Sequence, residues 1–329
     1  MEEFILGTNA AVAVTEVAKT AGKFAWLYKW FSNPEQTKKQ ADADAYEIER
    51  RIETAEKYPG WNITFKDGKL NLSECTYEEL VNRAKNRMLA ESIKKESNRE
   101  KVLVLAMNEV QQSEKIPEKP IDEDWRTRFF NIVEDVSSEE MQLIWSKILA
   151  GEITQPGKFS LRTLETIRNV SKDEAEIFQK IIPILMKFAN KLFITNNKDI
   201  LEKNGINYEM ILRLSECGLI SSNSLLSFDF KITDNDRILL SSNDSLIRIT
   251  GKNNIPYNFS LGVYTLTKAG EELYSILNKT YDKEYISNLA EKIYTDNKDK
   301  VVVSIHITAT PPLNDGRILY VDPPLRSFS

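Results

Sequence analysis

The stretch SSEEMQLIWSKILAGEITQPGKFSLRTLETI, from Ser137 to Ile167, indicates that this part of the chain is built from short, closely connected helices. Ser137 and Glu140 match a capping box, in which a hydroxyl and a carboxylate satisfy free amides at a helix start. We expect Gly151 to end that helix, because glycine adopts the left-handed conformation at little cost. Ser160 is expected to begin the next helix. Apolar residues recur at helical spacing and form one broad face: Met141, Ile144, Trp145, Ile148 and Leu149.

Similar signals lie on both sides of this stretch. Thr76 with Glu79, and Ser171 with Glu174, match two further capping boxes. Pro183 is expected to kink or interrupt a helical pattern, because proline lacks the amide that a helix needs. Short connections favour helices that pack as neighbours. We therefore predict a central multi-helix bundle over residues 121–192.

The composition limits the class of protein. Of 329 residues, 41% are hydrophobic and 28% are charged, so a sizeable core can form. The net charge of −5 does not favour a general phosphate binder. Two distant cysteines fit a reducing compartment, and a single histidine nearly excludes histidine-rich metal sites and most Ser/His mechanisms. We expect a cytoplasmic protein without a metal or cofactor, and peripheral contact with the inner membrane is kept as an addition.

Residues 1–58 are predicted to form amphipathic helices, the first of which ends in an aromatic cluster. Aromatic rings flanked by lysine suit a water–lipid boundary, because Trp and Tyr combine an apolar body with a polar edge. The same helix could instead pack on its own domain or on a sister subunit. The candidate membrane-binding or partner-binding residues are Phe24, Trp26, Tyr28, Lys29, Trp30 and Phe31.

Residues 59–116 change from strand to helix patterning. Trp61, Ile63 and Phe65 alternate with polar residues, and the Asp67-Gly68 turn signal predicts a small hairpin. A long helix should follow Thr76. Its many Lys and Arg residues alternate with Glu, which favours pairing on a wet surface over contact with nucleic acid.

Residues 200–329 combine a helix ending at Gly218, several strands and a helix capped by Thr267. This order predicts a winged-helix-like domain with extra β-strands and a C-terminal hairpin. The fold class that we expect is therefore mainly α with a smaller α+β part. It would comprise N-terminal helices, the central bundle and this C-terminal domain.

Three motifs resemble an uncharacterised bacterial family that is known only as a domain of unknown function. They are the EEMQxxWxxILAGE core at 139–152, the PGxFSxRTL connector at 156–164 and the YxLTKAGxEL segment at 264–273. A more remote likeness is to the abortive-infection alpha family, which is associated with bacterial defence against phage. That resemblance implies a defence role and supplies neither a mechanism nor catalytic residues.

The signature region also offers a candidate surface around its turn. Its members are Trp145, Lys147, Glu152, Phe159 and Arg162. Alternatively, the two aromatic side chains belong to the core and the charged pair ties the turn together, which is the interpretation that we favour.

Signals for catalysis are sparse. Asp229-Phe230-Lys231 resembles half of a metal-dependent nuclease site, in which carboxylates hold Mg²⁺ and a lysine supports the attacking water. His306 alternates with isoleucines, so we expect it on a surface or at an interface. For nucleic acid, the helix before Gly218 offers only Arg213 as a base-reading cation.

The sequence thus predicts a non-catalytic binding protein, a sensor or effector in anti-phage defence. We expect it to form homo-oligomers and to bind a protein partner, with contact at a membrane surface as an option. The alternative is a nucleic-acid-directed protein, either a winged-helix binder or a weak metal-dependent nuclease.

Overall fold

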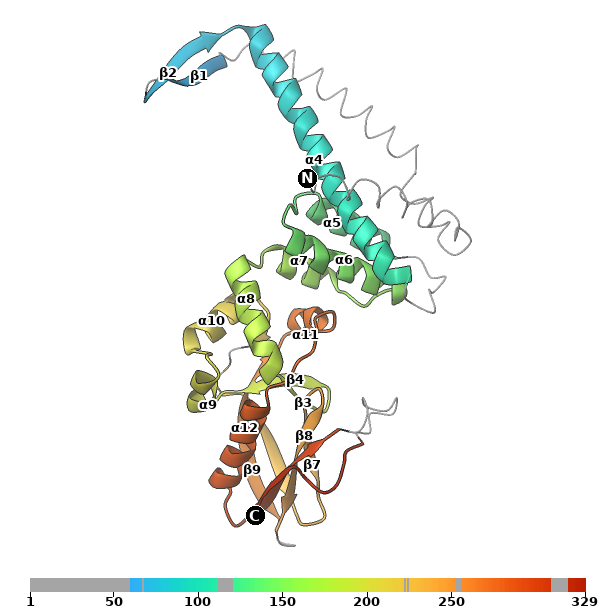
Figure 1. Cartoon of the computed structure of the whole chain (residues 1–329), viewed down its shortest axis with the longest axis vertical. Helices are drawn as coiled ribbons and strands as arrows, with labels where there is room; N and C mark the ends of the chain where they lie inside the picture. Colours follow the sequence, from blue (N-terminus) through green and yellow to red (C-terminus); the bar gives the residue numbers. More distant parts are fainter. Residues whose placement is uncertain are drawn as a thin grey trace, which may run out of the picture. The chain divides into compact units, whose positions relative to one another are not determined.

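The computed structural model describes residues 60–329, apart from residues 67, 112–120, 222, 224, 253–255 and 309–318. The chain divides into two compact units, Met1–Pro156 and Gly157–Ser329 (Figure 1). The four-part division predicted from the sequence is untested by this split and stays a prediction.

The described part of the first unit is a β-hairpin followed by three helices. Its elements are β1 (Gly60–Lys66), β2 (Lys69–Cys75), α4 (Tyr77–Gln111), α5 (Glu123–Val133) and α6 (Glu139–Thr154). α6 packs against α4, and the buried residues of α4 lie in its C-terminal half: Asn98, Val102, Ala106, Met107 and Val110. The N-terminal half of α4 is largely exposed and carries the hairpin at its end.

Side-chain caps begin the helices of this unit, and one of the two predicted caps lies one residue further along the chain. The predicted box at Thr76 is confirmed, since its hydroxyl accepts from the Glu79 amide at 3.3 Å and the Glu79 carboxylate accepts from the Thr76 amide at 3.0 Å. The α6 box expected at Ser137 is wrong. Ser138 is the N-cap, and its hydroxyl accepts from the Met141 amide at 3.2 Å.

The end of α6 also differs from the prediction. The helix continues through Gly151 to Thr154, and Gly151 is buried. A glycine inside a helix costs about 1 kcal/mol relative to alanine, but one more turn buries Ile153. The left-handed residue that follows is Gly157, with φ +90°.

The second unit contains helices between and after its strands. They are α7 (Leu161–Arg168), α8 (Lys172–Ile181), the 3-10 turn η1 (Ile182–Ile184), α9 (Lys198–Lys203), α10 (Tyr208–Glu216), α11 (Lys268–Tyr274) and α12 (Lys283–Asp296). The predicted capping box at Ser171 is confirmed, and Pro183 lies in η1, where α8 has already ended. Gly218 ends α10 with φ +80°, as the sequence indicates.

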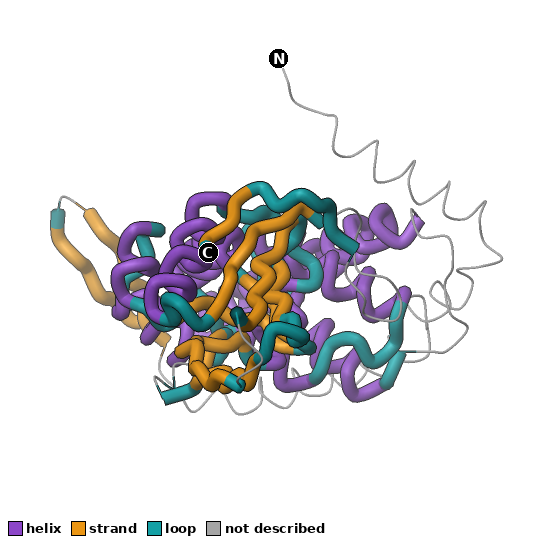
Figure 2. Tube along the Cα trace, turned by 90° about the horizontal axis from the view of Figure 1, so that it is seen from below, coloured by secondary structure: helices purple, strands orange, loops and turns teal. Residues whose placement is uncertain are grey.

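One nine-stranded antiparallel sheet forms the rest of this unit. Along its edge-to-edge path the order is β11-β10-β8-β7-β3-β4-β9-β5, and β6 pairs with β9. Figure 2 shows these strands running beside one another. The bounds are β3 (Met186–Phe188), β4 (Lys191–Thr195), β5 (Ile220–Ser221), β6 (Ser227–Ile232), β7 (Ile238–Ser241), β8 (Ser245–Gly251), β9 (Tyr257–Leu266), β10 (Val301–Ile307) and β11 (Arg326–Phe328).

This sheet overturns the predicted fold class. The chain is an α+β protein rather than a mainly α protein with a winged-helix-like end, because nine strands pair into one antiparallel sheet. Sequence patterning located several strands but not their pairing. Beyond Pro183 the chain enters β3, which pairs with β4 and β7.

One part of the core of the second unit lies between the sheet and α12, which packs against β10. Tyr285 of α12 is fully buried, and its hydroxyl accepts a hydrogen bond from the Thr195 amide of β4 at 2.9 Å. Burial raises the pKa of Tyr285, so the phenol stays neutral. Elsewhere in this unit, a Cβ added at Gly270 of α11 would lie 2.2 Å from the Leu219 carbonyl oxygen.

Candidate functional site

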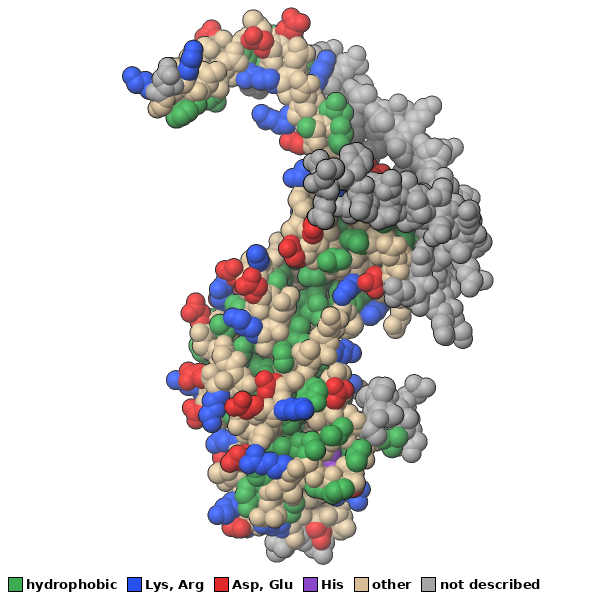
Figure 3. All heavy atoms as spheres, in the orientation of Figure 1, with side chains coloured by type: hydrophobic (Ala, Val, Ile, Leu, Met, Phe, Trp, Pro, Cys, Tyr) green, Lys and Arg blue, Asp and Glu red, His purple; other side chains and the backbone are tan. Residues whose placement is uncertain are grey.

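The β1–β2 hairpin exposes an apolar face. Strand pairing sets Ile63 opposite Leu72 and Phe65 opposite Leu70, while Trp61 stands opposite Glu74. Because directly opposed residues point to the same side of a sheet, these side chains share one face. The five apolar members expose between 51% and 75% of their surface. In Figure 3, hydrophobic side chains of the hairpin lie open at the surface.

The opposite face of the hairpin is polar. It carries Asn62, Thr64, Lys66, Lys69, Asn71 and Ser73, which alternate with the apolar residues along both strands. A face of five large apolar side chains on an otherwise polar two-stranded element is typical of a binding surface, because water-exposed apolar patches are unfavourable. We call the side of Trp61, Ile63, Phe65, Leu70 and Leu72 the hairpin face.

Polar contacts fix the base of the hairpin to the start of α4. Arg83 donates to the Trp61 carbonyl at 3.1 Å and to the Cys75 sulfur at 2.9 Å. Asn62 donates to the Glu79 carboxylate at 3.4 Å, and the Thr76 amide lowers the pKa of Glu79 most strongly, followed by Asn62. The hairpin therefore takes its direction from the first turns of α4.

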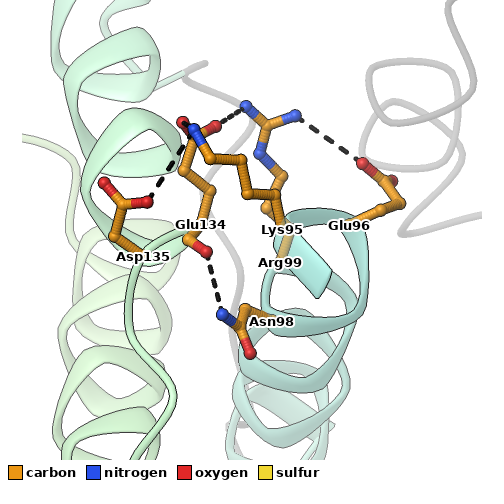
Figure 4. A network of polar contacts seen from close by, with 6 residues as sticks. All are labelled: Lys95, Glu96, Asn98, Arg99, Glu134 and Asp135. Carbon is orange, nitrogen blue, oxygen red and sulfur yellow. Dashed lines mark hydrogen bonds and ion pairs between the residues drawn. The ribbon is translucent and has the colours of Figure 1, made fainter. Parts of the chain in front are cut away.

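A network of charged and amide groups in turn holds α4 against the α5–α6 junction (Figure 4). The Lys95 ammonium lies 2.8 Å from a Glu134 carboxylate oxygen and 3.8 Å from Asp135. Arg99 forms an ion pair with the second Glu134 oxygen. The hydrogen bond from Lys95 to Glu134, and then the Glu134 charge, raise the pKa of Lys95.

Amide groups complete this junction on its buried side. Asn98 donates to the Glu134 backbone carbonyl at 2.8 Å. Gln142 of α6 donates to the Asn98 carbonyl oxygen at 3.3 Å and to the Val136 carbonyl at 2.9 Å. Several of the basic residues of α4 thus contact another helix or the hairpin, whereas the sequence predicted pairing mainly along α4 itself.

Of the two sites predicted from the sequence, only the signature surface lies among the described residues. Phe24, Trp26, Tyr28, Lys29, Trp30 and Phe31 lie outside the described residues. The signature surface is divided between the units, with Trp145, Lys147 and Glu152 in the first and Phe159 and Arg162 in the second. Trp145, Glu152 and Phe159 are buried, Lys147 is half-buried and Arg162 is exposed. Only the last two side chains could offer much surface to a partner, so the signature surface stays a prediction.

The residues considered for nucleic acid contact already have protein neighbours. Arg213 of α10 lies 3.5 Å from the Asp173 carboxylate. Asp229 of β6 accepts hydrogen bonds from Ser227 at 3.1 Å and from Ser260 at 2.5 Å. Strand β9 places Ser260 opposite Asp229 and Asn258 opposite Lys231, where a two-carboxylate site would need an acidic residue.

His306 is buried, with 1% of its surface exposed, so the prediction of a surface position is wrong. Its Nε2 lies 2.9 Å from the Ser304 hydroxyl, and its Nδ1 lies 3.0 Å from the Val321 carbonyl and 3.2 Å from the Asp322 carboxylate. The order serine, histidine, aspartate matches a nucleophilic triad in connectivity only. Ser304 is itself buried, so its hydroxyl is closed to a substrate, and the histidine fastens the returning chain to β10.

Within the described ranges, no group of three or more His, Cys, Asp and Glu residues is placed to hold a metal ion. Among those same residues, no helix has both the length and the apolar character needed to cross a membrane.

The hairpin face was visible in the sequence, but its role was not. Alternation predicted the strands and the turn, which the structure confirms. A half-buried strand and a strand with an exposed apolar face share the same alternating pattern, so burial had to come from the structure.

Comparison with known proteins matches the chain to one family. The model of a family described as "Protein of unknown function (DUF2806)" matches residues 82–290. No curated protein and no solved structure matches the chain. The predicted resemblance to a domain-of-unknown-function family is confirmed, and the likeness to the abortive-infection family stays a prediction.

Proposed function

Because the chain belongs to the DUF2806 family of proteins of unknown function, we propose from its own surfaces that it is a binding protein whose contact element is the hairpin face. The single observation that carries this proposal is the set of five exposed apolar side chains on one side of β1–β2. A two-stranded hairpin is marginal in water by itself, so an exposed apolar face is expected to gain a partner.

The connection of the hairpin to the first unit supports this role. The hairpin is fixed to α4 through Arg83 and Glu79, and α4 is fixed to the α5–α6 junction through Lys95 and Arg99. One continuous helix, α4, therefore connects a partner bound at the hairpin to the helical core. This arrangement suits a sensor or effector that acts by binding.

We place this binding role in bacterial anti-phage defence. The support is the remote likeness of the EEMQ helix to the abortive-infection alpha family. A protection assay tests it, because cells that carry the protein should give fewer plaques than cells that carry an Ile63→Ser, Phe65→Ser variant. Equal plaque numbers for the two, with both proteins present at the same level, would contradict the defence role of the hairpin face.

The binding role itself is tested by photo-crosslinking in cells. A photoreactive phenylalanine at position 65 should give at least one discrete product of higher mass, because its side chain points into the proposed contact. The same amino acid at Thr64, on the polar face, is the matched control and should give little product. If position 65 yields no more product than position 64, the proposed binding function is wrong.

A further inference from the structure

We propose that the occupant of the hairpin face is the same face of a second copy of this chain, with the two hairpins stacked antiparallel. This inference rests on the proposed binding function and names its partner. It follows from the area of the face, its self-complementary chemistry and the position of its one carboxylate.

The area of the face suits a pairwise interface. Large apolar side chains carry roughly 150–250 Å² each, so five residues exposed by 51–75% leave about 600 Å² on each copy. A stable protein–protein interface buries about 800 Å² per partner, and the hairpin edges would supply part of the remainder. The face alone therefore provides most of the surface that a two-fold dimer needs.

The chemistry of the face fits a copy of itself. Its central rows, Ile63 with Leu72 and Phe65 with Leu70, are uncharged and apolar, so two such faces can interdigitate like the two layers of a sandwich. An isologous contact uses the same patch on both subunits and closes without further growth. Stacking also gives the two-stranded hairpin the second layer that it lacks.

Charge decides the direction of stacking. Glu74 stands opposite Trp61 at the base of the face, whereas Lys66 and Lys69 flank the turn at the tip. Parallel stacking would bring the two Glu74 carboxylates together at one end of a desolvated contact, which is unfavourable. Antiparallel stacking sets the two carboxylates at opposite ends of the contact, while Lys66 and Lys69 lie on the polar face, away from it.

The first test is the oligomeric state of the purified full-length chain, measured by sedimentation velocity over a concentration series. Ile63→Ser with Phe65→Ser should raise the dissociation constant of the dimer at least ~100-fold, because four central contacts are lost per dimer. Tyr208→Ser with Leu225→Ser, which removes two exposed apolar side chains of the other unit, is the matched control and should leave the dimer unchanged.

The second test is the direction of stacking, read from a Glu74→Gln variant in the same sedimentation series. Antiparallel stacking keeps the two Glu74 carboxylates at opposite ends of the contact, so their removal should leave the dissociation constant within about twofold. Parallel stacking would bring the carboxylates together, and their removal would then strengthen the dimer. A dimer that Glu74→Gln tightens at least about tenfold overturns the antiparallel pairing.

Three other results overturn the inference. One is a wild-type chain that stays monomeric at all concentrations, and another is a dimer that survives both Ile63→Ser with Phe65→Ser and the separate variant Leu70→Glu. The third is a monomer whose binding to vesicles of anionic phospholipid is lost in those variants, which would make a bilayer the occupant. In each case discrete photo-crosslinks from position 65 to another molecule in cells would leave the proposed function standing, and their absence would remove it as well.

Discussion

The Lys95 ammonium lies 2.8 Å from the carboxylate of Glu134, which also pairs with Arg99. Glu134 is mostly covered, with 16% of its side chain exposed, while Lys95 remains 44% exposed. The carboxylate is therefore the central member of the junction between α4 and the turn after α5. Its substitution should matter more than that of either cation.

Replacement of Glu134 by Gln should destabilise the first unit by about 1–3 kcal/mol, because one mostly covered carboxylate serves two cations. Urea unfolding followed by circular dichroism measures the loss. Asp135→Asn is the matched control, since Asp135 is exposed and lies 3.8 Å from Lys95, and its effect should stay within about 0.5 kcal/mol. Equal effects of the two variants would contradict the central role of Glu134.

Acid should loosen the junction between the hairpin and α4. The pKa of Glu79 is lowered from 4.5 by the Thr76 amide and then by Asn62, so its folded-state pKa lies below its unfolded value. Such a group stabilises the fold fully above pH 4.5, and the contribution is lost as pH falls through the lowered pKa. Amide hydrogen exchange at Thr76, corrected for intrinsic rates, should accelerate as pH falls below 4.5.

Glu79→Gln is the control for this pH effect. The amide side chain can still accept from the Thr76 amide but does not titrate in this range, so protection at Thr76 should be weaker and independent of pH below 4.5. An identical acid response in wild type and variant would show that another group controls the junction.

Removal of the Tyr285 hydroxyl should destabilise the second unit by about 1–3 kcal/mol. In the wild-type chain the Thr195 amide donates to the Tyr285 hydroxyl at 2.9 Å. Tyr285→Phe keeps the ring but removes this acceptor, so the amide loses its side-chain partner in the core. Thermal unfolding measures the change. Tyr208→Phe is the matched control, because Tyr208 is exposed, and no change in melting temperature is expected for it.

The glycine of the LTKAGEEL motif should not tolerate alanine. A Cβ at Gly270 would lie 2.2 Å from the backbone oxygen of Leu219, which cannot move as a flexible side chain would. We expect Gly270→Ala to cost about 1–3 kcal/mol, although alanine normally favours a helix. Lys268→Ala in the first turn of the same helix should be nearly neutral, and a neutral Gly270→Ala would refute the close approach.

The hairpin shows how far the candidate site could be predicted. The alternation of Trp61, Ile63 and Phe65 and the turn at Gly68 predicted both strands, because a two-residue turn and its register depend on neighbouring residues. Exposure of the hairpin face depends on what the rest of the chain leaves uncovered. No local pattern contains that information, so the sequence offered the aromatic cluster of residues 24–31 instead.

Histidine 306 and the large sheet show the same limit in the second unit. The strand around His306 was predicted. The burial of the His306 side chain depends on Val321 and Asp322, which contact it although Val321 lies fifteen residues further along the chain. β3 and β9 both pair with β4, although about seventy residues separate them. Pairing at such distances is decided by which apolar faces can be covered together, so a winged-helix-like end was the wrong extrapolation.

The sequence by itself determined the starts and stops that depend on a few adjacent residues: the boxes at Thr76 and Ser171, the interruption at Pro183 and the end of α10 at Gly218. These features are fixed by hydrogen bonds and backbone angles within one turn. The tertiary structure alone decided the order of the nine strands, the continuation of α6 past Gly151, the burial of His306 and the exposure of the hairpin face. Each of these depends on surface that distant parts of the chain cover or leave open, and burial is a property of the whole fold.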